Sequence, residues 1–158
     1  MAEKQTDIKN KEKLNLVITT PRGVKFDLEA DMVIMRCIDG DLGVLPGHEA
    51  LSTVLGDGTL RVINDGIESK IALFGGVVEI DDTKVNIYST IAQRPEEIDL
   101  ERAKQDREKA EAALNEKIDD AQFKRLQAMM RRSIVRINVN TQLEDSDYFK
   151  VGEDDDEE

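Results

Sequence analysis

The chain has 158 residues, of which 39% are hydrophobic and 35% charged, and its formal net charge is −12. This size suits one domain, or one small domain with an appendage, and no run approaches the ~18 apolar residues of a membrane-spanning helix. One histidine and one cysteine exclude a disulfide framework and clustered metal ligands, and the acidic balance argues against a nucleic-acid ligand. The N-terminal residues lack the apolar core of a secretory signal, so we expect a cytosolic protein.

Residues 14–90, which follow an N-terminal extension of residues 1–13, show the two-residue alternation of β-strands. One face of the first predicted strand carries Leu14, Leu16 and Ile18. One face of the next carries Val24, Phe26 and Leu28. Asn64-Asp65-Gly66 predicts a hairpin turn, because asparagine and glycine accept a positive φ. Short strands separated by polar turns predict a small antiparallel β-sandwich or barrel.

Residues 95–138 change to a helical period. Pro95, followed by Glu96 and Glu97, predicts a helix start, since proline pre-sets φ and acids suit the N-terminal end of the helix dipole. A polar connection at 115–120 follows, with Asp119 or Asp120 as the N-cap of a second helix. Two helices joined in this way predict an antiparallel hairpin.

The two predicted helices differ in their apolar faces. The first has a small stripe of Ala103, Ala110, Ala113 and Leu114. The second has a stronger line of Phe123, Leu126, Met130, Ile134 and Ile137. Because isolated helical hairpins are marginally stable, we expect this one to need a docking surface, and it could use more than one.

Residues 139–158 form an acidic end. Nine of the 34 acids and one of the 22 bases lie in residues 144–158, which leaves 25 acids against 21 bases in the rest of the chain. Like charges packed so closely repel one another and bury little apolar area, so residues 139–158 are predicted to be a disordered tail.

A basic face runs opposite the apolar line of the second helix. It carries Arg125, Arg132 and Arg136, and on the first helix Asp99, Arg102 and Lys109 share one face. The first interpretation is a solvated face paired with neighbouring acids. The second is a cradle for a polyphosphate, since the planar fork of arginine matches phosphate oxygens. No Walker loop accompanies it.

Three motifs in this order resemble a known family. Residues 39–48 read DGDLGVLPGH, residues 75–80 read GGVVEI, and residues 98–103 read IDLERA. They resemble the signature loop, the Gly-Gly strand and the nucleotide motif Ile/Leu-Asp-x-x-Arg-Ala of the epsilon subunit of bacterial F-type ATP synthases. The resemblance covers roughly residues 14–138 and implies an N-terminal β-sandwich followed by a C-terminal helical hairpin.

The resemblance also implies a function. A subunit of this family is not an enzyme; it regulates and couples the central rotor, on the cytoplasmic face of the bacterial membrane and peripheral to it. Its sandwich binds the gamma subunit and rests on the c-ring. Its hairpin lies folded on the sandwich or extends towards the catalytic alpha and beta subunits, where it inhibits ATP hydrolysis. In some members ATP stabilises the folded form, and no metal is implied.

The resemblance places a set of residues at that ATP site: Ile98, Asp99, Arg102, Ala103, Lys109, Arg132 and Arg136. This chain departs from the pattern at Gln93, where ATP-binding members can have glutamate, and at Lys109, where they can have arginine. Lysine keeps the charge but loses the fork, so we expect weaker binding. Two other functions remain open, a free-standing ATP sensor and a helical interaction module without nucleotide.

Overall fold

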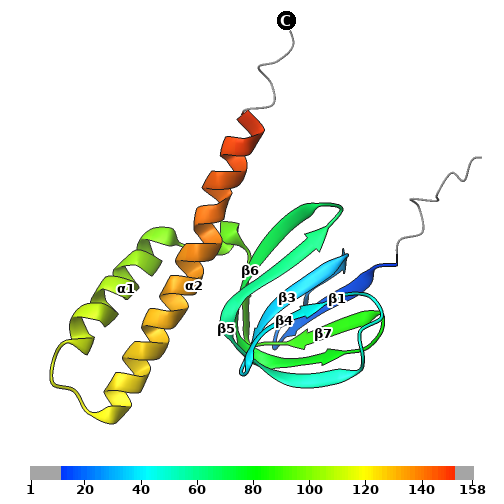
Figure 1. Cartoon of the computed structure of the whole chain (residues 1–158). Helices are drawn as coiled ribbons and strands as arrows, with labels where there is room; N and C mark the ends of the chain where they lie inside the picture. Colours follow the sequence, from blue (N-terminus) through cyan, green and yellow to red (C-terminus); the bar gives the residue numbers. More distant parts are fainter. Residues whose placement is uncertain (1–11, 152–158) are drawn as a thin grey trace, which may run out of the picture.

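The computed structural model describes the backbone of residues 12–151 and the side chains of residues 12–141. A β-sandwich comes first in the chain and two helices follow, with α2 lying between α1 and the sandwich (Figure 1). The strands are β1 (Leu14–Thr20), β2 (Gly23–Ala30), β3 (Met32–Cys37), β4 (Gly40–Val44), β5 (Leu51–Asn64), β6 (Ile67–Ile80), β7 (Lys84–Tyr88) and β8 (Ile91–Gln93). The helical elements are a 3₁₀ turn η2 (Pro95–Glu97), α1 (Leu100–Leu114) and α2 (Asp120–Val151).

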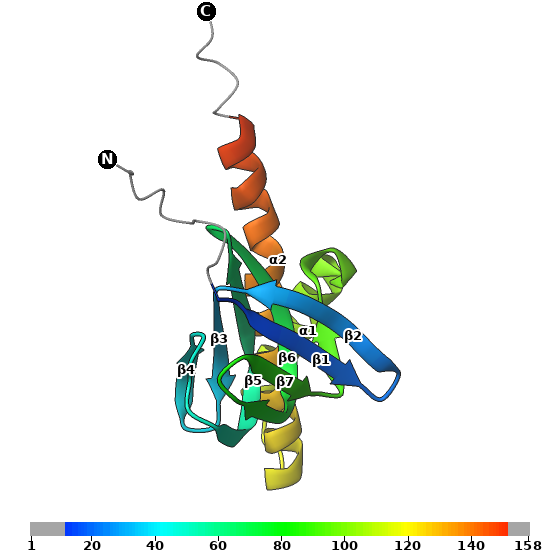
Figure 2. The same cartoon turned by 90° about the vertical axis from the view of Figure 1, so that its right-hand side faces the viewer.

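The strands form one sheet in the order β2-β1-β7-β6-β5-β3-β4, with β8 paired to β6. All strand pairs in the described residues are antiparallel except β1 with β7. The sheet folds over on itself, and Figure 2 shows β1 and β2 crossing in front of β6. The predicted β-sandwich followed by a two-helix hairpin is confirmed.

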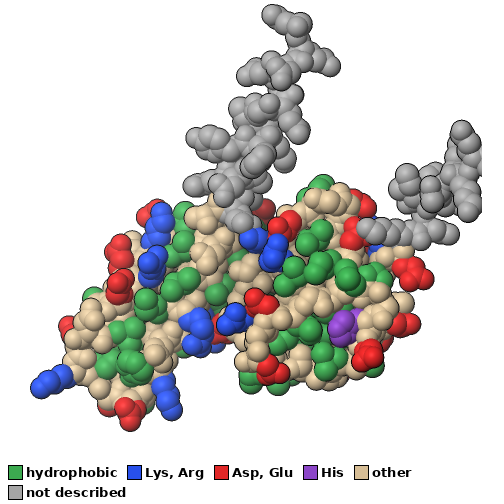
Figure 3. Space-filling view, in the orientation of Figure 1, with side chains coloured by type: hydrophobic (Ala, Val, Ile, Leu, Met, Phe, Trp, Pro, Cys, Tyr) green, Lys and Arg blue, Asp and Glu red, His purple; other side chains and the backbone are tan. Residues whose placement is uncertain are grey.

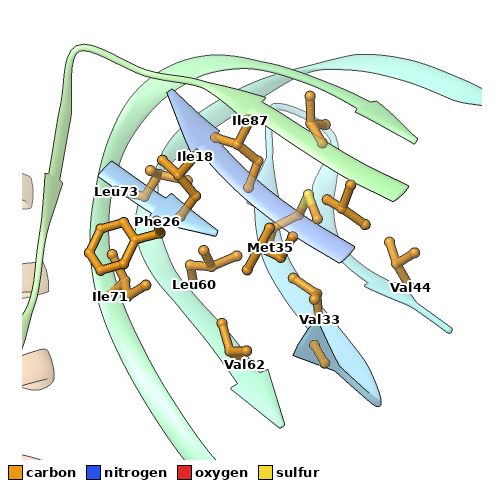
Figure 4. Packing of buried hydrophobic residues seen from close by; sticks show 14 of the residues in the cluster. Ile18, Phe26, Val33, Met35, Val44, Leu60, Val62, Ile71, Leu73 and Ile87 are labelled. Atoms are coloured by element: carbon orange, nitrogen blue, oxygen red, sulfur yellow. The ribbon is translucent and has the colours of Figure 1, made fainter. Parts of the chain in front are cut away.

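Buried apolar side chains from both sides of the folded sheet fill the sandwich (Figure 4). The predicted face of β1 is correct, since Leu14, Leu16 and Ile18 are fully buried. The predicted face of β2 is wrong at Val24, which is 63% exposed while Phe26 is buried. A bulge causes this difference: Phe26 pairs with Ile18 but Val24 pairs with Thr19, so Val24 and Phe26 point to opposite faces.

One turn and one close approach between strands explain two glycines in the sequence. Asp65 and Gly66 join β5 to β6 with φ of 52° and 76°, the conformation that the hairpin prediction required. Gly76, in the Gly-Gly strand, has φ of 115°, and a Cβ there would lie 2.1 Å from the carbonyl oxygen of Tyr88. A residue with a side chain at position 76 would therefore force β6 away from the end of β7.

The predicted boundaries need three corrections. The sandwich continues past residue 90 into β8, and α1 begins at Leu100 rather than at Pro95, with Asp99 as its N-cap. Helix α2, capped by Asp119, continues through residues 139–151, so the disordered tail predicted from residue 139 is wrong there. Val139 is fully buried, and the first glycine or proline after it is Gly152, so nothing ends the helix earlier.

The rest of the two predicted ends, residues 1–11 and 152–158, lies outside the described residues. Lys13, assigned to the extension, is attached to the sandwich: its Nζ donates to Oδ1 of Asp65 at 2.7 Å and lies 3.5 Å from Oδ1 of Asp31. Among the helices of residues 12–151, none is long and apolar enough to cross a membrane.

Helix α2 packs on the outer side of β6 through a small apolar patch. Its members are Ala72, Phe74, Ile98, Val135 and Val139, with Ile91 at the edge. The apolar line predicted for α2 is not this buried face, since Phe123 is 42% exposed and Leu126, Met130, Ile134 and Ile137 are half-buried. The side of α2 that carries Val135, Arg132 and Arg136 faces the sandwich instead.

Candidate functional site

A pocket of about 300 Å³ lies where β8, η2, α1 and α2 meet, and we call it the candidate pocket. Its lining residues are Gln93, Glu97, Ile98, Asp99, Arg102, Ala103, Asp106 and Arg136. The structure thus brings together five of the predicted site residues: Ile98, Asp99, Arg102, Ala103 and Arg136. Arg132 lies beside the pocket, on the turn of α2 before Arg136, and Lys109 and Arg125 are exposed and not part of the lining.

The start of α1 is shaped by its own sequence. The side chain of Asp99 accepts a hydrogen bond from the backbone nitrogen of Arg102 at 3.1 Å, which caps the helix. Ile98 is 7% exposed and packs with Phe74, and Ala103 is 2% exposed. The Ile-Asp-x-x-Arg-Ala motif therefore has a structural role at the start of α1. It also places the first turn of α1 next to the pocket.

Arg136 is the central cation of the pocket. Its Nε donates to Oε1 of Gln93 at 2.9 Å, and its guanidinium lies 4.6 Å from the centre of the Phe74 ring. Burial lowers the pKa of Arg136, and the positive charges of Arg132 and Arg102 lower it further, against the opposite effect of Asp106. Positive charge is therefore in excess around this guanidinium, which is the condition that an anion would relieve.

The acids of the pocket are already engaged at two positions. Oε2 of Glu97 lies 2.7 Å from Nζ of Lys25, and this hydrogen bond holds the pKa of Glu97 below its ordinary value. Asp99 caps α1. Asp106, half-buried on the next turn of α1, is the remaining carboxylate of the lining.

Arg132 makes contacts that the sequence did not indicate. Its Nε and the Nε of Arg131 each lie 3.4 Å from Oδ2 of Asp57, a residue of β5 whose side chain is 9% exposed. Arg132 also lies 5.6 Å from the ring centre of Phe74. We call Arg131, Arg132 and Arg136 the arginine row; Figure 3 shows Lys and Arg side chains gathered along the boundary between hairpin and sandwich.

Asp57 and Phe74 are the residues that sequence reasoning missed. They are paired across β5 and β6 in the same register. A weak signal existed, since Asp57 stands between Gly56 and Gly58 inside a strand, where an isolated acid has no packing role. Nothing in the local pattern indicated that α2 docks over it.

The fold defines a class of two-part protein: a β-sandwich with a helical arm, α1 and α2, docked on it through a small apolar patch and cationic side chains. Comparison with known families agrees. Residues 13–95 match the beta-sandwich domain of the ATP synthase delta/epsilon chain, and residues 96–140 match its long alpha-helix domain. The chain belongs to the ATP synthase delta/epsilon chain family.

Curated relatives point to one member of that family. The chain is similar to the ATP synthase epsilon chain of Caldicellulosiruptor saccharolyticus, at 36% identity over 78% of this chain and 90% of the relative. It is 38% identical to the epsilon chain of Desulforamulus reducens, over 77% and 92% of the two chains. The predictions of an epsilon chain, and of a non-catalytic subunit of an ATP synthase, are confirmed.

Solved structures share the fold. A chain of the Euglena gracilis mitochondrial ATP synthase, solved as OSCP/F1/c-ring, matches with a TM-score of 0.63 at 23% identity, over 92% of this chain and 88% of that chain. A chain of the Tetrahymena thermophila mitochondrial ATP synthase central stalk and c-ring matches with a TM-score of 0.53 at 14% identity, over 83% and 98%.

Proposed function

We propose that this chain is a regulatory and coupling subunit of the central rotor of an F-type ATP synthase. Its sandwich binds the gamma subunit and contacts the c-ring, on the cytoplasmic face of a bacterial membrane and peripheral to it. Family membership supports this, as do the central-stalk and c-ring assemblies in which the structural neighbours were solved.

The way in which the arm is docked on the sandwich is the observation that supports a regulatory role. The apolar patch under α2 is small, and the contacts around it are ion pairs, a side-chain hydrogen bond and arginine–aromatic contacts. Such groups are exchanged for water, or for other acids, at modest cost. The arm can therefore leave the sandwich and extend towards the alpha and beta subunits, where the arginine row and Arg125 would pair with acids and inhibit ATP hydrolysis.

ATP is the ligand that the candidate pocket suits. Arg102 and Arg136 line it and Arg132 lies beside it, so three guanidinium groups are available to phosphate oxygens. The charges that lower the pKa of Arg136 would be neutralised by a polyphosphate. Because Arg102 comes from α1 and Arg136 from α2, a nucleotide held by both would fix the helices together and favour the folded arm. Gln93, already bonded to Arg136, and the exposed Lys109 make this site weaker than one with glutamate and arginine at those positions.

The test of inhibition uses the assembled enzyme. Removing residues 95–158 should raise the rate of ATP hydrolysis, and replacing Arg125, Arg132 and Arg136 together by alanine should have much of the same effect. A control that replaces Lys104, Arg107 and Lys117, exposed cations of the same arm, should leave the rate unchanged. If the truncated and triple-alanine enzymes hydrolyse ATP at the wild-type rate under all nucleotide conditions, the arm is not an inhibitor.

Rotor membership is tested separately. The full chain should co-purify with the gamma subunit and the c-ring, and the chain without residues 95–158 should still do so, since the proposed contacts belong to the sandwich. Failure of the full chain to bind gamma would favour a free-standing ATP sensor or interaction module instead, and ATP titration would then separate those two.

A further inference from the structure

Asp57 occupies an unusual place for an acid. It lies in the middle of β5, with its side chain only 9% exposed, beneath α2. Its cross-strand neighbour is Phe74, over which Arg132 and Arg136 also lie. Next to Asp57, β5 and β3 approach closely, since a Cβ on Gly58 would lie 2.5 Å from Cβ of Arg36 on β3. The carboxylate is therefore presented to α2 from a strand of the sandwich.

The contacts of Asp57 differ in kind from those of the candidate pocket. The pocket is lined by β8, η2, α1 and α2, so an anion in it joins the two helices. Asp57 belongs to β5 and pairs with Arg131 and Arg132, so it joins α2 directly to the sandwich. One carboxylate thus serves two guanidinium groups at one end of the arginine row, while Arg136 at the other end borders the pocket.

We propose that Asp57 is a built-in anionic latch that holds the arm on the sandwich when no nucleotide is bound. The arm of this chain would then be docked without ATP, and ATP would add to the docked state rather than create it. The proposal uses the undocked arm of the proposed function but needs no ATP site.

The latch matters because the rest of the docking surface is small. The apolar patch contributes few side chains from α2, Val135 and Val139 being the buried ones. Arg131 and Arg132 are 57% and 44% exposed, so each ion pair is screened by water and its contribution is modest. Two such pairs together should shift the ratio of docked to undocked arms by about fivefold.

The experiment measures docking in the full chain without nucleotide. Spin labels on Glu49→Cys, in the sandwich, and Ala112→Cys, on α1, are both at exposed positions, whereas the native Cys37 is buried. Pulsed electron paramagnetic resonance then gives the populations of docked and undocked arms. We expect a mostly docked wild type, and a docked-to-undocked ratio about fivefold lower in Asp57→Asn. An unchanged ratio, or a wild type that is undocked without nucleotide, overturns the proposal.

Two further variants test whether the effect comes from the contact between Asp57 and the arginines. Asp41→Asn removes a carboxylate of β4, the last strand of the sheet order, that pairs with Arg36 at the same 3.4 Å, and it should leave the ratio unchanged. Arg131→Gln removes the latch from its helical side, at an exposed position that cannot disturb the sandwich core. It should also lower the docked-to-undocked ratio. In the double variant with Asp57→Asn, the change in docking free energy should be smaller than the sum of the two single changes. A fully additive double variant, or an effect of Asp41→Asn equal to that of Asp57→Asn, counts against the latch.

Adding millimolar ATP separates this proposal from the ATP site. If ATP restores docking in Asp57→Asn, the latch and the nucleotide act on one equilibrium, as proposed. If Asp57→Asn undocks and ATP restores nothing, the latch stands and nucleotide binding at the candidate pocket fails.

Discussion

The interior of the sandwich and the surface between the sandwich and α2 differ in the kinds of side chain that they contain. The interior is a continuous apolar cluster with side chains such as Leu14, Leu16 and Leu60 fully buried. The surface under α2 has a small apolar patch surrounded by guanidinium groups, a carboxylate and an amide. The apolar burial of the interior is lost only by unfolding, whereas charged contacts can be re-formed with other partners. The contrast separates a scaffold held by apolar burial from an arm held largely by charged and polar contacts, as the proposed movement of the arm requires.

Leu16→Ala should give the largest effect and tests the permanent side of this contrast. Deleting a fully buried leucine side chain costs about 2–5 kcal/mol of unfolding free energy, because a cavity remains. Urea denaturation followed by circular dichroism would measure it. Leu45→Ala, at a residue that is 55% exposed, should change the unfolding free energy by less than about 0.5 kcal/mol. Equal losses in the two variants would mean that the core is not where the stability lies.

Val139→Ala tests the movable side. Val139 is fully buried in the patch under α2, and removing its two methyl groups should weaken docking by about 1.5 kcal/mol. The unfolding of the sandwich should be nearly unaffected. The spin-label distances measure docking, and Phe123→Ala, at a 42% exposed position on the same helix, serves as the control. If Val139→Ala lowered the unfolding free energy of the sandwich by the same amount of about 1.5 kcal/mol, the arm and the scaffold would form one cooperative unit.

Arg136→Ala sharpens the contrast at the pocket. Its charged contact with a phosphate contributes roughly 1.5–3 kcal/mol, so ATP binding should weaken by about tenfold or more. Calorimetric titration of the isolated protein measures this, with Arg107→Ala, an exposed cation of α1 outside the pocket, as the control. Absence of any heat from the wild type with millimolar ATP would mean that Gln93 and Lys109 have removed the site.

Glu97→Gln should give the smallest effect and depends on pH. Lys25 holds the pKa of Glu97 below the ordinary 4.5, so the ionised, paired form stabilises the folded chain above that pH. This contribution is lost as pH falls through the lowered pKa. Both side chains are partly exposed, so it amounts to about 0.5 kcal/mol. In urea denaturation near pH 6 the unfolding free energy of the wild type should exceed that of Glu97→Gln by this amount. The difference should disappear as the pH falls below the lowered pKa of Glu97; a difference independent of pH would contradict the ion pair.

Sequence patterns predicted the scaffold better than the arm, for a physical reason. Strand alternation reports burial on a sheet face directly, so the buried face of β1 was correct. The three-residue β8 is too short to show alternation, and the bulge in β2 changes the face without changing the composition. For α2, periodicity defines faces but does not say which neighbour each face meets. The stronger apolar line suited either the sandwich or the first helix, and the arginine side is the one that contacts the sandwich.

The candidate site was predicted in part for the same reason. The motif at residues 98–103 is local, and four of its residues line the candidate pocket: Ile98, Asp99, Arg102 and Ala103. The partners from the sandwich, Asp57 and Phe74, are brought to α2 only by the tertiary fold, 74 positions separating Asp57 from Arg131. No window of the sequence contains both ends of that contact.

The parallel pairing of β1 with β7 has a consequence for the order in which the molecule forms. Residues Asn15 to Thr19 find their partners only in Lys84 to Tyr88, so the sandwich cannot close until nearly all of its chain is available. Contacts of such long sequence separation slow folding, because loop-closure entropy precedes their gain. On the ribosome the sandwich is therefore completed only shortly before the arm emerges, and the arm is synthesised next to a platform that is already in place. Docking of the arm on the sandwich is then the final step in forming the described fold.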